Sequence, residues 1–184
     1  MVAGGSHQGE GAGRNGGQVD SILDVIVSRR SVRKWRSNAV SDVDIKDMLE
    51  AAMNAPSAVN EQAWQFVLLS GKVLEDFLKI NGNTPKGAPV GILVCGDKKL
   101  DKLGGFYLHD CCAATQNILL AAHAKGLGGV WTAVFPNAIP EVRKLLNLPD
   151  HVIPVSFVPF GYPDVRQPKP SSRYDEAKVH RNGW

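Results

Sequence analysis

Three arginines and a serine within five residues form the stretch of this chain best suited to binding chemistry. The segment Arg29-Arg30-Ser31-Val32-Arg33 follows directly after an apolar helical pattern. Guanidinium groups match phosphate oxygens, and a hydrogen bond to a charged group contributes about 1.5–3 kcal/mol. A cluster this tight would suit one phosphate held at a helix end. The alternative is a solvated basic turn without a ligand.

A second polar stretch, residues 55–64, lies between a helical pattern and an apolar strand. Besides small side chains, this stretch contains Ser57, Asn60 and Gln62, which offer hydrogen-bond donors and acceptors without charge. Binding residues often lie on such loops, although a plain connection between a helix and a strand is the alternative.

The segment Gly126-Leu127-Gly128-Gly129 has the composition of a nucleotide-binding loop but not its context. Such motifs place glycines between a strand and a helix, so that phosphate meets the helix N-terminus. Here the glycines follow a helical pattern, and Gly126 stands where a left-handed C-cap residue belongs. A Rossmann or P-loop site is therefore excluded, but Gly128 and Gly129 could let a flat ligand approach the following strand backbone.

Helical and strand patterns surround these three segments and must position them. Capping-box patterns at Ser21 and Ser41 mark two helix starts, and Pro56 should end the second helix. Further apolar patterns predict two short helices, one carrying Leu74 and one opening at Pro140. Apolar runs predict strands over residues 66–69, 90–95, 130–134 and 153–160, of which the first two are expected to be buried.

The longest helical pattern begins at Asp110 as its cap and reaches to about Lys125. It is apolar on nearly every side, so it should be enclosed by other elements or by a partner subunit. Cys111 and Cys112 lie within this pattern, and both are expected to be small core residues rather than redox groups.

Composition limits the class of protein. The chain has 184 residues, 43% of them hydrophobic, a formal charge of +3 and three cysteines. This charge is too small to predict nucleic-acid binding, and no apolar run is long enough to span a membrane. The odd cysteine count favours a reducing, cytoplasmic location. Residues 1–19 are glycine-rich and are expected to form a flexible tail, whereas residues 20–184 should form one domain.

In their order and spacing, four motifs together resemble the FMN-dependent nitroreductase family over about residues 20–184. The arginine segment is the first, and Ala55-Pro56-Ser57-Ala58 with Asn60, Gln62 and Trp64 is the second. The third runs from Asp110 through Gln116-Asn117 to Trp131, and the fourth joins Gly161-Tyr162-Pro163 to Arg173, His180 and Trp184.

The resemblance implies an α+β fold with three α/β/α layers, a mainly antiparallel sheet and an intertwined homodimer. FMN would lie at the dimer interface, and an arm from about residue 162 to 184 would wrap the partner. Arg29, Arg30, Ser31 and Arg33 would hold the phosphate and ribityl chain, with Arg173 and Lys169 adding positive charge. The other subunit would bring Pro56, Ser57, Ala58, Asn60 and Gln62 to the isoalloxazine ring, and Gly128 and Gly129 would approach the flavin.

The implied activity is ping-pong hydride transfer from NADH or NADPH through FMN to nitroaromatics, quinones or similar small-molecule acceptors. No side chain is assigned as a catalytic acid or base, because the flavin supplies the chemistry. Alternatives are a non-catalytic FMN-binding or sensing module and a specialised flavin enzyme of the same fold, such as a dehalogenase or dehydrogenase. One departure is Ala63, where the family commonly has proline, and it is expected to loosen the loop that lines the substrate pocket.

Overall fold

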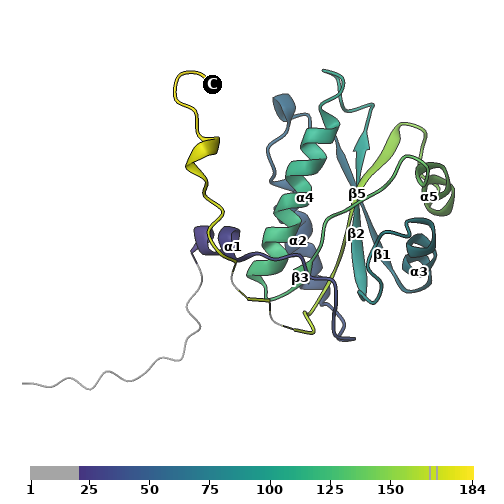
Figure 1. The fold of residues 1–184 in the computed structure, drawn as a ribbon. Helices are drawn as coiled ribbons and strands as arrows, with labels where there is room; N and C mark the ends of the chain where they lie inside the picture. The colour runs from purple at the N-terminus through teal and green to yellow at the C-terminus, as the bar shows by residue number, and fades with distance from the viewer. Residues whose placement is uncertain (1–20, 166, 169) are drawn as a thin grey trace, which may run out of the picture.

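One antiparallel sheet lies between two layers of helices in the computed structural model (Figure 1). The structure describes residues 21–165, 167–168 and 170–184. The tail expected for residues 1–19 and Lys169, a predicted cofactor-binding residue, lie outside these ranges. Helices α2 (Asp42–Met53) and α4 (Tyr107–Ala124) cover one face, and α3 (Gly71–Ile80) and α5 (Ile139–Leu146) cover the other. This arrangement confirms the predicted α+β fold with α/β/α layers.

Strand β5 (Val152–Gly161) occupies the centre of the sheet, although it is the last strand in the chain. On one side it pairs with β2 (Val90–Asp97), which in turn pairs with β1 (Trp64–Ser70). On the other side it pairs with β3 (Gly128–Gly129) and β4 (Thr132–Ala133). Each of these strand pairs is antiparallel, which fits the predicted sheet.

Both faces of β2 are buried because helices cover both sides of the sheet. Ile92 and Val94 pack with Ile118 of α4 on one face, together with Met48 of α2. Leu93 lies on the other face, where the rings of Phe77 and Phe157 pack with centroids 4.5 Å apart. A strand buried on both faces reads as a continuous apolar run, which is why the sequence predicted it well.

Two strand predictions are wrong in detail. The first strand, β1, lies at the sheet edge and is only partly buried: Leu69 is 2% exposed, whereas Leu68 is 45% exposed. The strand predicted over residues 130–134 is replaced by two short pairings with β5, one at Gly128–Gly129 and one at Thr132–Ala133. Gly129 approaches β5 closely: a Cβ at this position would lie 3.0 Å from the Pro159 carbonyl oxygen.

Helix α4 begins at Tyr107, three residues before the predicted cap. Asp101 organises the preceding turn, where its carboxylate accepts hydrogen bonds from the backbone N–H groups of Gly105 and Phe106 at 2.6 and 3.2 Å. Asp110 is therefore a residue of the first helical turn and not the N-cap. Cys111 is buried as expected, but Cys112 is exposed, so its assignment to the core is wrong.

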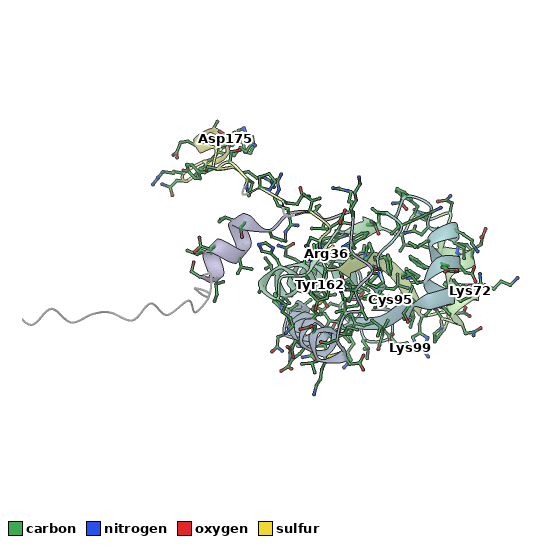
Figure 2. The ribbon with its side chains drawn as sticks, turned by 90° about the horizontal axis from the view of Figure 1, so that it is seen from below. Arg36, Lys72, Cys95, Lys99, Tyr162 and Asp175 are labelled. Atoms are coloured by element: carbon green, nitrogen blue, oxygen red, sulfur yellow. The ribbon has the colours of Figure 1, made fainter. Side chains whose placement is uncertain are left out.

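Helix α1 (Ile22–Ser28) and the C-terminal arm extend away from the sheet and its helices (Figures 1 and 2). Ser21 caps α1 as predicted, but none of the helix residues is buried, and Ile22 is 81% exposed. Among its described residues the arm forms one short 3₁₀ helix, η2 (Glu176–Lys178), and near its end the rings of His180 and Trp184 stack. Among the described residues, no helix has the length and apolarity needed to cross a bilayer.

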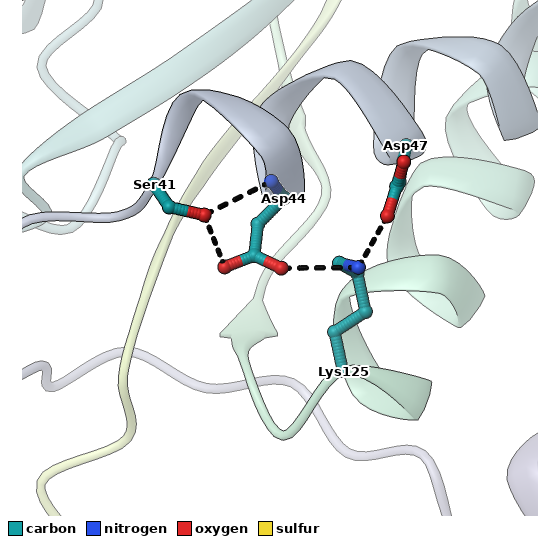
Figure 3. A network of polar contacts seen from close by, with 4 residues as sticks. All are labelled: Ser41, Asp44, Asp47 and Lys125. Carbon is teal, nitrogen blue, oxygen red and sulfur yellow. Dashed lines mark hydrogen bonds and ion pairs between the residues drawn. The ribbon is translucent and has the colours of Figure 1, made fainter.

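A polar network joins the start of α2 to the end of α4 (Figure 3). Ser41 caps α2 by accepting a hydrogen bond from the Asp44 N–H at 3.1 Å, and its hydroxyl donates back to the Asp44 carboxylate at 2.7 Å. Lys125 Nζ lies 3.0 Å from Asp44 Oδ1 and 2.5 Å from Asp47 Oδ2. The network fixes the antiparallel packing of the two helices.

Asp44→Asn should destabilise the protein at pH 7 by about 0.2–1 kcal/mol, the range for a partly exposed ion pair. The Ser41 hydrogen bond, followed by Lys125, lowers the pKa of the Asp44 carboxyl below its ordinary 3.8. The stabilisation is therefore present above pH 3.8 and is lost as the pH falls through the lower folded-state pKa. Urea unfolding at pH 7 and at steps below pH 4 should show the difference from wild type shrinking. Asp42→Asn, in the same helical turn, controls for the helix dipole.

Candidate functional site

The arginine segment begins where α1 ends, with Arg29 as the C-cap residue. Arg29 and Arg30 are half-buried, whereas Ser31 and Arg33 are exposed. Val32 is the anchor between them, with only 6% of its surface exposed. The segment therefore contacts the domain through Val32, and its polar side chains precede and follow that residue.

Backbone and indole hydrogen bonds fix the segment to the predicted glycine pair. The Val32 N–H donates to the Gly129 carbonyl at 3.0 Å, and the Trp35 Nε1–H donates to the Gly128 carbonyl at 2.7 Å. Further along, the Arg36 N–H donates to the Tyr162 carbonyl at 2.9 Å. Figure 2 shows Arg36 and Tyr162 close together at the side of the domain from which α1 projects. Three predicted motifs, far apart in sequence, thus meet here.

Gly128→Ala should disturb this docking, because a Cβ at that position would lie 2.4 Å from Val32 Cγ2 and 2.8 Å from Val32 Cβ. Relieving that overlap must displace the arginine segment, and such overpacking costs about 1–3 kcal/mol. We expect a lower urea midpoint and weaker binding of an anionic ligand. Gly82→Ala is the matched control, since a Cβ there would meet no atom within 4 Å. Equal stability of the two variants would contradict this account.

Positive charge is concentrated between the end of α1 and the arm. The pKa of the Arg29 guanidinium is lowered, first by burial and then by the nearby charges of Arg173 and Arg30. Arg29 and Arg173 also line a cavity of about 550 Å³, together with Ile26 and Val27 of α1 and Tyr174 of the arm. Cations that lie close together in a partly buried cavity repel one another, and a bound anion would reduce that repulsion.

The second predicted segment, Pro56–Gln62, forms a compact loop held by its own polar groups. Ser57 Oγ accepts a hydrogen bond from the Gln62 N–H at 3.0 Å, and Gln62 Nε2 donates to Asn60 Oδ1 at 3.2 Å. Ala63, expected to loosen this loop, is fully buried, and its carbonyl accepts from the Asp97 N–H at 3.0 Å. The end of the loop is thus well anchored without a proline.

Three residues of this loop have left-handed backbone conformations: Val59, Asn60 and Gln62, with φ of 42°, 60° and 52°. For a β-branched residue such as Val59 this region is an outlier, and Val59 is also 72% exposed. Strained backbone of this kind persists only where its surroundings over-determine it, and it concentrates at ligand sites. The loop geometry therefore favours a binding role over a plain connection.

The loop and the arginine segment lie at opposite ends of α4 (Figure 1). The Ala58 N–H donates to Asp110 Oδ1 near the start of the helix, at 2.9 Å. Ser28, just before the arginines, hydrogen-bonds His123 Nε2 near its end, at 2.8 Å. His123 lies thirteen positions after Asp110 on the helix, which corresponds to about 20 Å along the axis. One chain therefore does not bring the two predicted halves of the site together.

Sequence reasoning missed two residues that the structure places at these segments, Trp35 and Asp110. The tryptophan follows the arginines closely, but no pattern signals that its indole binds a glycine carbonyl. Asp110 was interpreted as a helix cap, which concealed its contact with the distant loop. The part of the chain that the structure describes contains no cluster of side chains suited to a metal ion.

A family model described as "Nitroreductase family" matches residues 26–90 and 77–162, which is well over half of the chain. The chain belongs to the nitroreductase family. Both the arginine segment and the polar loop fall within the matched residues, as does the whole sheet. The family assignment thus confirms the resemblance that the motifs indicated.

Several nitroreductase relatives match over most of their length. A protein of Methanothermobacter thermautotrophicus, provisionally named an NADH dehydrogenase/NAD(P)H nitroreductase, is 42% identical and covers 89% of this chain and 87% of its own. A Parabacteroides distasonis structure with the same provisional name is 38% identical, with TM-score 0.81 and coverage of 89% and 98%. An FMN-dependent nitroreductase of Clostridium difficile is 26% identical, with TM-score 0.76 and coverage of 88% and 99%.

Proposed function

We propose that this protein is an FMN-dependent oxidoreductase that uses NADH or NADPH to reduce nitroaromatics, quinones or similar acceptors by a ping-pong mechanism. The observation that carries the proposal is the arginine segment, docked on Gly128 and Gly129 with Arg173 beside Arg29. This combination places concentrated positive charge on a segment that the glycine backbone holds in position. The names of the relatives agree with a flavin and a nicotinamide nucleotide.

The residues available fit FMN, which carries a phosphate at one end and a flat ring at the other. Arg29, Arg30 and Arg33 would hold the phosphate with the Ser31 hydroxyl, and Arg173 would add charge from the arm, as would Lys169. Guanidinium forks suit a phosphate because two N–H groups can bind two oxygens at once. Gly128 and Gly129 would serve the site by seating the arginine segment, since Val32 lies where a Cβ at Gly128 would stand.

The polar loop would contact the uncharged ring. Ser57 and Ala58 are half-buried, whereas Pro56, Asn60 and Gln62 are exposed at the surface of a single chain. Amide and hydroxyl groups hydrogen-bond the polar ring edge without adding charge, and the small Ala58 side chain leaves room for a flat group. When bound, FMN supplies the two-electron chemistry between the nicotinamide and the acceptor. The protein binds and orients the cofactor and the reactants, and it excludes water.

A homodimer would complete the site, because the two halves are about 20 Å apart along α4 in one chain. Exposed apolar side chains support such an assembly. Ile22 and Leu23 of α1 are 81% and 73% exposed, and Tyr174 and Trp184 of the arm are 72% and fully exposed. A seven-residue helix with no buried side chain is marginal alone in water. We propose that residues 20–184 form one flavin-binding domain whose arm, from about residue 162, packs on the partner.

The purified protein should be yellow and should oxidise NADH or NADPH faster when a quinone or nitroaromatic acceptor is added. Absorbance at the flavin and nicotinamide bands measures both properties. A flavin-loaded protein without turnover on either nucleotide would contradict the enzymatic proposal. Anaerobic mixing separates the enzyme from a storage or sensing module, because only the enzyme loses its flavin colour rapidly when the nucleotide is added.

A further inference from the structure

Asp110 is a buried acid at the start of α4 that the proposed chemistry does not use. It is the fourth residue of the helix and is only 3% exposed. Acidic residues are common in a first helical turn, where they offset the helix dipole, but that role requires no burial. Carboxylates are rarely buried to this degree unless their oxygens have specific partners.

The partner of Asp110 is the loop assigned to the flavin ring. Its Oδ1 accepts a hydrogen bond from the Ala58 N–H at 2.9 Å, across 52 positions of sequence. Ala58 opens the 3₁₀ turn η1 (Ala58–Asn60), and the side chain of the preceding Ser57 does not cap that turn. Instead, Ser57 Oγ accepts from the Gln62 N–H. The carboxylate thus satisfies the first free N–H of the turn from outside the loop.

The bond lies at the most strained part of the loop. Val59 and Asn60, the two residues after Ala58, both have positive φ. Such conformations persist only when neighbouring contacts fix the chain on either side. Ser57 and Gln62 fix one another, and Asp110 fixes the residue between Ser57 and the strained pair.

The second carboxylate oxygen shows that this arrangement is not optimised for stability. Asp110 Oδ2 is buried and has no hydrogen-bond partner among the described residues. A buried oxygen without a partner lowers stability, so the carboxylate holds the loop at a cost that a fully hydrogen-bonded group would not carry. An unpartnered buried polar atom in a native protein calls for an explanation, and a functional requirement on the loop supplies one.

We propose that Asp110 is a positioning residue that holds Ser57–Gln62 in the conformation required to contact the flavin ring. It acts through the Ala58 N–H and does not itself touch the reacting atoms. This inference rests on the proposed FMN site, because it assigns the loop's required shape to that ligand.

Asp110→Ala tests the inference in the full-length protein. It removes the acceptor and should speed deuterium exchange over residues 56–62 about tenfold, measured by mass spectrometry. It should also shift the bound-flavin absorption spectrum and raise the Kd for FMN about tenfold. Asp110→Asn keeps an acceptor oxygen at the same place and should stay within about threefold of wild type on both measurements.

Thr115→Val is the matched control, one helical turn further along α4. Thr115 is fully buried and hydrogen-bonds Ser156 Oγ at 2.7 Å without contacting the loop. Its loss should lower the Tm, as a buried polar deletion does, but leave loop exchange and the flavin spectrum unchanged. A Tm loss common to both variants therefore does not account for a loop effect found only at Asp110.

Ala58→Pro removes the N–H that donates to Asp110. It provides a second test if Asp110→Ala does not fold. Proline lacks the N–H, and the φ of −137° and ψ of 155° at Ser57 suit a residue before proline. It should reproduce the spectral shift and the weaker FMN binding. The inference is overturned if loop exchange stays at the wild-type rate in these variants, or if it rises without any change in flavin spectrum or affinity. A wild-type protein that binds no FMN would instead refute the proposed function, while exchange over residues 56–62 would still report on the Asp110 contact.

Discussion

Replacing Arg29 and Arg33 together by alanine should release FMN and leave the proposed homodimer folded. Each arginine offers charge-assisted hydrogen bonds to phosphate, and the loss of two raises the Kd by about 10²–10⁴-fold. The fold should survive because the segment is anchored by Val32, which is buried, and by backbone bonds to Gly129. Removing Arg29, which lies near Arg173, also relieves repulsion in the apo protein.

Flavin occupancy by absorbance and dimer mass by light scattering measure the two halves of this result. Lys34→Ala with Lys46→Ala is the matched control, since it removes the same charge from two exposed side chains outside the proposed site. That control should stay yellow. A double arginine variant that retains normal flavin occupancy would overturn the phosphate assignment, and one that retains flavin only at low salt would point to a weaker electrostatic role.

Two defective chains should restore a working site when they are paired. One partner carries Arg29→Ala and Arg33→Ala, and the other carries Asn60→Ala and Gln62→Ala. Both changes in the loop delete an amide and place alanine at a positive φ, which disfavours the native loop. Each homodimer should bind little flavin. If the site combines the arginines of one chain with the loop of the other, each heterodimer contains one intact site and one site with both defects.

Co-expression with two different affinity tags isolates the heterodimer, whose flavin content should be one per dimer, half that of wild type. A heterodimer in which both chains carry the arginine changes, purified in the same way, is the control and should bind little flavin. A mixed heterodimer as empty as this control would contradict a site shared between subunits. The expected gain is large because neither parent homodimer has any intact site.

Local signals were sufficient to predict most of the fold. Ser21 and Ser41 cap their helices as expected, because capping depends on residues within three positions. The apolar run at β2 predicted a strand buried on both faces. The errors arose where long-range pairing decides the structure: Gly128 and Gly129 pair with β5 although glycine has low strand propensity.

The candidate site was less predictable than the fold. Charge and spacing indicated Arg29 and Arg30, whereas Arg173 was expected only from the family resemblance, and the structure brings its charge close to Arg29. The Asp110–Ala58 hydrogen bond links positions 52 residues apart, and a capping interpretation of Asp110 explained the local sequence equally well. Likewise, the positive φ of Val59 has no local signal, because valine disfavours it.

The central place of β5 determines when the chain can fold during its synthesis. Strands β2, β3 and β4 all pair with β5, which leaves the ribosome after each of them. Until residues 152–161 emerge, β2 has one unpaired edge and the core between α4 and the sheet lacks Val158 and Phe160. The bridge from Trp35 to Pro163 forms later still, because Pro163 follows β5 in the chain. Between the emergence of β2 and that of β5, nascent chains therefore expose the apolar sheet edge that β5 later covers.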